Sequence, residues 1–145
     1  MRTLLIFCWI WLSFLAMSIW ESSVEGRKAW DKGKQGPKVR IPHLCVISTY
    51  HFFLAWIMLP MLVVGLPLLI SGWDKSLFFI LASAFSSGLV IEDFGWYLVN
   101  PKVKLKELYT PFSDYYPWLK ISGKKILPWF YILGVILAVV FFYLA

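Results

Sequence analysis

The chain of 145 residues is 60% hydrophobic and only 15% charged, and 19% of its residues are aromatic. A water-soluble domain of this size needs more charged residues to cover its surface. The composition therefore excludes an ordinary soluble domain and indicates a membrane protein. The formal net charge is +6, but the cations lie in two blocks beside apolar segments. That arrangement favours contact with anionic lipid headgroups and argues against nucleic-acid binding.

Four apolar segments are long enough to cross the hydrocarbon core of a bilayer, which about 17 to 25 helical residues span. They are residues 4–20, 44–71, 76–100 and 126–145. The second segment contains Pro60 and Pro67, which predict a tilted or kinked helix. The short turn at 72–75 predicts that the helices on either side of it are antiparallel. We therefore predict an all-α fold, in which residues 1–145 form a single membrane domain of about four transmembrane helices.

Small residues lie at helical spacing on the third segment. Ala84 and Gly88 lie on one face, and Ala82 and Ser86 lie on the adjoining face. This spacing lets the backbone of another helix come close. We therefore expect tight helix packing on this side of the segment.

Two basic segments, 21–43 and 101–125, each hold six of the 14 Lys and Arg residues, which leaves only Arg2 and Lys75 for the opposite side. Loops rich in Lys and Arg tend to stay in the cytoplasm. We therefore predict a multi-pass protein of the cell (plasma) membrane with both termini extracytoplasmic. The first apolar segment also resembles a cleavable signal peptide, but cleavage would place both basic segments outside, so we expect the segment to be retained.

The mixture of Lys and aromatic residues in 101–125 predicts a stretch that lies along the headgroups.

The most informative residues are Glu92 and Asp93, adjacent carboxylates inside the otherwise uncharged third segment. Ionisable residues within a span are costly and mark functional sites. His51 lies about seven residues inside the second segment, and because the two helices are antiparallel, its depth of about 10 Å roughly matches that of Glu92. Trp96 and Asn100 lie further along the same helix and complete the set of candidate site residues.

Three interpretations of these residues stay open. A hydrogen bond between His51 and a carboxylate would fix the register of the helices. A transition-metal site would use His51, Glu92, Asp93 and the interfacial His43. The carboxylates could also relay protons or cations. No HExxH, paired CxxC or EF-hand pattern is present, so the sequence specifies no particular metal or cofactor.

The stretch GLVIEDFGWYLVNP, from Gly88 to Pro101, resembles a group of small uncharacterised prokaryotic membrane proteins. In that group a span ends with an acidic pair, an aromatic cluster and Asn-Pro. The resemblance implies a polytopic membrane protein and no particular activity. It also implies a Trp-His pair further along the chain, where this sequence has Trp118-Leu119, and this departure argues against a metal site shared with that group.

The sequence favours a small non-catalytic subunit or scaffold that packs beside other membrane subunits or further copies of itself, because it has few catalytic groups and little soluble chain. One alternative is a metal-binding or proton- or ion-active membrane protein centred on His51, Glu92 and Asp93. A transporter component is another. The last is a lipid-modifying enzyme whose basic segment 101–125 holds lipid headgroups beside the carboxylates.

Overall fold

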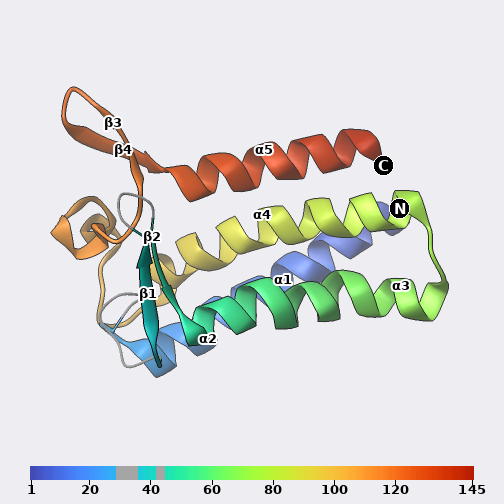
Figure 1. Cartoon of the computed structure of the whole chain (residues 1–145), viewed down its shortest axis with the longest axis horizontal. Helices are drawn as coiled ribbons and strands as arrows, with labels where there is room; N and C mark the ends of the chain where they lie inside the picture. The colour runs from blue at the N-terminus through green and yellow to red at the C-terminus, as the bar shows by residue number, and fades with distance from the viewer. Residues whose placement is uncertain (29–35, 42–44) are drawn as a thin grey trace.

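The computed structural model describes residues 1–28, 36–41 and 45–145. Over these residues the chain forms a bundle of helices with two small β-hairpins at one end (Figure 1). Three helices are long and apolar enough to cross a membrane, and a fourth, shorter helix is also apolar. The prediction of an all-α bundle of about four helices is therefore confirmed, and three of the helices have the length and composition of membrane spans.

The helices follow the four apolar segments of the sequence. They are α1 (Arg2–Glu25), a second helix made of α2 (Thr49–His51), η1 (Phe52–Met58), η2 (Met61–Gly65) and α3 (Leu66–Ser71), then α4 (Lys75–Val99) and α5 (Trp129–Leu144). The second helix has wide π-helical turns on both sides of Pro60. Proline has no N–H and crowds the preceding turn, and the wider turns accommodate it without ending the helix.

The ends of the helices differ from the segments that hydropathy outlines. The first helix continues to Glu25, five residues beyond the predicted 4–20, and it ends where Gly26 takes a φ of 59° and donates its N–H to the Ser22 carbonyl. The second begins only at Thr49, because Ser48 accepts the His51 N–H and starts the helix there. The fourth begins at Trp129, after a strand.

Two antiparallel hairpins account for the later helix starts. Strands β1 (Lys38–Ile41) and β2 (Cys45–Ser48) form the first hairpin, and β3 (Trp118–Ile121) and β4 (Lys124–Pro128) form the second. Both hairpins lie at the end of the bundle opposite the chain termini and the α3–α4 turn (Figure 1). The all-α class thus holds for the membrane bundle, with strands confined to this end.

Residues 101–128 fold into a compact unit, which we call the aromatic cap. It contains the 3-10 helices η3 (Leu105–Tyr109) and η4 (Pro111–Ser113) and the second hairpin. Its buried side chains pack with two from the end of α4 in one apolar cluster: Trp96, Tyr97, Val103, Leu108 and Trp118. Several of the aromatic side chains that we expected to face the lipid therefore bury one another, and the position of the cap at the headgroups stays a prediction.

Helix α4 is the centre of the bundle and packs against α1 on one side and α5 on the other (Figure 1). Gly88 lets α1 come so close that a Cβ atom there would overlap the Phe14 ring. Gly95 lies in the same way against Ser18. The predicted close packing on the small-residue side of this helix therefore takes place inside the chain.

Replacing Gly88 by Ala tests this packing. Because the added methyl group meets the Phe14 ring, we expect the free energy of unfolding in detergent to fall by about 1 to 3 kcal/mol, the usual cost of overpacking. Gly65→Ala is the matched control, since a Cβ there lies 3.8 Å from the Pro60 carbonyl oxygen, an ordinary contact. Equal stabilities of the two variants would contradict the packing, whereas partial rescue of Gly88→Ala by Phe14→Leu would support it.

Candidate metal centre

Three potential metal ligands converge where α1 ends and the second helix begins. Glu21 and Glu25 lie on successive turns of α1 and His51 ends α2, and one ligand atom of each lies within 4.8 Å of the other two. The His51 and Glu25 side chains are only 6% and 7% exposed, and Glu21 is 5% exposed. They are the only such group among the residues that the structure describes.

The His51 imidazole is held in place by its own helix start. Its Nδ1 lies 2.6 Å from the Ser48 hydroxyl, and its Nε2 lies 3.4 Å from Glu25 Oε1. A hydrogen bond at one ring nitrogen fixes the orientation of the ring and presents the other nitrogen to a metal ion, an arrangement common in metal sites. The short β2 strand, which the sequence did not predict, positions Ser48 for this contact.

A fourth carboxyl group extends the group of ligands toward α4. The Glu92 carboxyl group interacts with the Glu21 carboxyl group, and Tyr50 donates a hydrogen bond of 3.0 Å to the same Glu21. The buried Oε1 atom of Glu92 has no hydrogen-bond partner. Two carboxyl groups in contact need a shared proton or a cation between them. We call Glu21, Glu25, His51 and Glu92 the acidic cluster.

Asp93 lies beside the acidic cluster but is bonded elsewhere. Its two carboxylate oxygens accept hydrogen bonds of 2.6 Å from Tyr116 of the aromatic cap and Tyr131 of α5. Burial and the neighbouring Asp93 raise the pKa of Tyr116 well above its usual range, so this phenol keeps the proton that it donates. Asp93 therefore joins α4, the aromatic cap and α5, and neither of its oxygens points free toward a ligand.

Asn100 and Trp96 also connect α4 to the aromatic cap. The Asn100 side chain donates to the Gly26 carbonyl at 2.7 Å and accepts from the backbone N–H groups of Lys102 and Val103. It thereby ties the end of α1 to the start of the aromatic cap. Trp96 lies in the apolar cluster of that cap, 6.5 Å from Phe112 in a stacked arrangement, and its buried indole N–H has no partner.

The sequence therefore identified part of the centre. His51 and Glu92 do lie at the same end of the bundle. However, His51 contacts Glu25, and Asp93 accepts hydrogen bonds from tyrosines. His43 lies outside the described residues. Glu21 and Glu25 were missed because they were assigned to a polar loop, although their spacing of four places both on one side of a helix.

An exposed ion pair holds the end of α1 against the aromatic cap. Arg27 contacts both carboxylate oxygens of Glu107, at 3.2 and 2.7 Å, and also donates to the Lys102 carbonyl at 2.7 Å. The Arg27 guanidinium, with the Lys104 backbone N–H, lowers the pKa of Glu107 to about 2. The Arg27–Glu107 pair lies at the same end of α1 as Glu21 and Glu25.

No protein-family model matches the chain, and no curated protein or solved structure is similar to it. The resemblance of residues 88–101 to small prokaryotic membrane proteins therefore stays a prediction. What the centre can do follows from its geometry and its donor atoms.

The Arg27–Glu107 pair predicts how stability depends on pH. A carboxyl group with a lowered pKa in the folded state stabilises the protein fully above its ordinary pKa of about 4.3, and this contribution is lost as pH falls toward the folded value. We therefore expect wild type to melt at a higher temperature than Glu107→Gln at pH 7, and the gap to narrow between about pH 4.5 and 2. Arg27→Gln should show the same narrowing, and a gap that stays constant with pH would contradict the assignment.

Proposed function

We propose that the chain is a multi-pass protein of the cell membrane that binds one divalent transition-metal ion in the acidic cluster. The observation that supports this proposal is the convergence of His51, Glu21 and Glu25 in a buried site. The unpartnered oxygen of Glu92 lies beside them and supplies a fourth potential ligand. An ion there would neutralise carboxylates that are otherwise costly to bury within a membrane bundle.

The donor atoms favour a metal such as zinc, iron or manganese. One imidazole nitrogen with two or three carboxylate oxygens is a donor set that these ions accept, whereas magnesium prefers oxygen ligands alone. The spacing agrees with this. Ligands about 2.1 Å from a tetrahedral ion lie about 3.4 Å apart, which is the separation of His51 Nε2 and Glu25 Oε1.

The alternatives have less support. The scaffold hypothesis drew on a small-residue side of α4, but Gly88 on that side packs against Phe14 of α1 in the same chain. A proton relay through Asp93 has to compete with two tyrosine hydrogen bonds. Subunit, transporter and lipid-modifying roles stay predictions, and a metal site is compatible with each of them.

We further propose that the acidic cluster faces the cytoplasm and that both termini are extracytoplasmic. Arg2 starts α1 and Lys75 starts α4, both at the end of the bundle opposite the aromatic cap (Figure 1). The described parts of the basic segments 21–43 and 101–125 lie at the capped end. The strong difference in Lys and Arg content between the two ends supports this orientation.

Reporter fusions test the orientation. Alkaline phosphatase fused after Ala145 should be active, because that enzyme folds only outside the cytoplasm, whereas the same enzyme inserted after Lys104 should be inactive. Green fluorescent protein at the two positions should give the opposite pattern. Fluorescence from the Ala145 fusion would contradict the proposed orientation without affecting the metal site.

Metal analysis tests the site itself. Protein purified in detergent, loaded with zinc or with cobalt as a spectroscopic probe and then desalted, should retain about one ion per chain. His51→Gln and Glu25→Gln each remove a ligand, so both should lower the affinity by at least about 10-fold, and Ser48→Ala, which frees the ring, by about 10-fold or more. Helical content by circular dichroism should be unchanged for a fair comparison.

Two matched carboxyl-to-amide changes serve as controls. Asp74→Asn, at the opposite end of the bundle, should bind the ion like wild type. Asp93→Asn should lose stability but keep its affinity, because the tyrosines already occupy that carboxylate, whereas Glu92→Gln should weaken binding. A wild-type protein without bound metal, or His51→Gln with unchanged affinity, would contradict the proposed function.

A further inference from the structure

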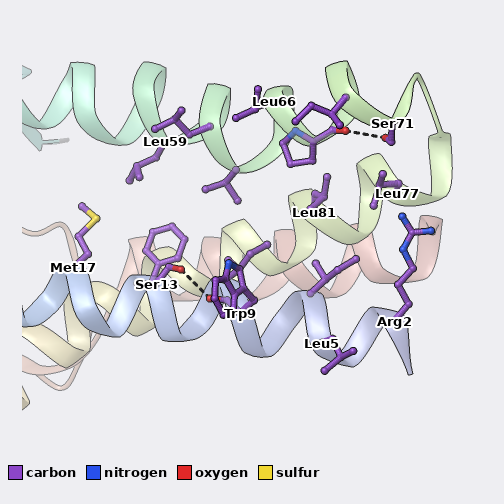
Figure 2. Close-up of a pocket in the computed structure, with 17 residues that line it drawn as sticks. Arg2, Leu5, Trp9, Ser13, Met17, Leu59, Leu66, Ser71, Leu77 and Leu81 are labelled. Carbon is purple, nitrogen blue, oxygen red and sulfur yellow. Dashed lines mark hydrogen bonds between the residues drawn. The ribbon is translucent and has the colours of Figure 1, made fainter.

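A lateral groove runs along the membrane-spanning part of the bundle between α1 and the second helix, with α4 as its floor. Side chains from all three helices line it, among them Leu5 and Trp9 of α1, Leu59 and Leu66 of the second helix, and Leu77 and Leu81 of α4 (Figure 2). The cavity measures about 760 Å³. It extends along α1 from Arg2 to Met17.

The wall of the lateral groove is apolar and lies open to the side. Trp9 is 75% exposed, and Leu5 and Leu66 are also exposed. The hydroxyls of Ser13 and Ser71 are turned back to carbonyl groups of their own helices, at 2.9 Å to Trp9 and 2.8 Å to Pro67. Both hydroxyl protons are therefore already donated within the protein. The groove offers a ligand a mainly apolar wall, which suits a hydrocarbon chain.

One end of the lateral groove is cationic. Among the residues that line it, only Arg2 carries a charge, and Figure 2 places Arg2 at the same end as Ser71 and Leu77. This is the end where α1 begins and where α3 turns into α4, at the edge of the membrane-spanning segments. A guanidinium group binds phosphate through paired hydrogen bonds.

We propose that the lateral groove binds one acyl chain of a phospholipid whose phosphate pairs with Arg2. The groove is long enough, because the 16 residues from Arg2 to Met17 span about 22 Å of helix, and one leaflet of acyl chains fills about half of the 30 Å hydrocarbon core. This site is separate from the acidic cluster and does not depend on the proposed metal.

The size of the groove fits a small ligand. Its cavity of about 760 Å³ lies within the range of about 300 to 1,000 Å³ that is usual for such ligands. The cationic end at Arg2 favours an anionic lipid over an apolar helix as the occupant.

Lipid affinity then comes from the phosphate more than from the hydrocarbon, because a lipid tail gains little by leaving other tails for an apolar groove. We expect native mass spectrometry of the detergent-solubilised full chain to retain one dioleoyl phosphatidylglycerol. The same experiment with dioleoylglycerol, which has the same acyl chains and no phosphate, should retain about 10-fold less.

Two pairs of variants test the placement. Arg2→Gln should retain about 10-fold less of the phospholipid, whereas Lys75→Gln, a change of the neighbouring cation outside the lining, should retain it like wild type. Leu66→Trp fills the groove and should also reduce retention, and Leu133→Trp on the exposed side of α5 is its control. His51→Gln should leave lipid binding unchanged, so that failure of the metal proposal and of the lipid proposal can be distinguished.

Photo-crosslinking locates the acyl chain directly. A phosphatidylglycerol with a diazirine in its acyl chain should label Leu5 to Met17 or Leu59 to Ser71. Labelling confined to α5, or equal retention by Arg2→Gln and Lys75→Gln, would overturn the proposal. Crosslinks between two copies through the groove would also overturn it, because they would show a second chain as the occupant.

Discussion

The contact between the Glu21 and Glu92 carboxyl groups is the constraint on which this end of the molecule depends. It joins α1 to α4, and Glu25 and His51 lie directly beside it. Carboxylates buried in a membrane bundle repel one another and lack water. Burying these carboxyl groups is costly unless they share protons or contact a cation. A metal ion in the acidic cluster, as proposed above, would supply that positive charge.

The surrounding structure keeps these ligands in place. Ser48 orients the imidazole, and Tyr50 bonds to Glu21. Around them, Asn100 and the Arg27–Glu107 pair fasten the end of α1 to the aromatic cap, and Asp93 fastens the cap to α5 through two phenols. Preorganised ligands supported by a second layer of hydrogen bonds are what a metal site needs. The aromatic cap therefore holds in place the helix ends that carry the proposed ligands.

The membrane bundle could be predicted from the sequence because uninterrupted apolar segments are a direct physical signal. The ends of the helices could not, since hydropathy does not mark them. Helix α1 continues through the polar residues Glu21 and Glu25 to the turn at Gly26, and the Ser48 side chain caps the start of the second helix. The depth of His51 was predicted from the antiparallel geometry of the second helix and α4. Its partner Glu25 was not predicted, because the spacing of residues along those two helices does not show that α1 packs beside them. The aromatic cap was missed for a similar reason, since its side chains bury one another and not the membrane.

Anomalous X-ray diffraction from crystals of the zinc-loaded protein would locate the proposed ion. We expect a single strong peak at the zinc edge about 2.0 to 2.2 Å from His51 Nε2 and from carboxylate oxygens of Glu25 and Glu21. Full zinc occupancy at another place in the chain, or an acidic cluster that stays without a peak at saturating zinc, would contradict the proposed site.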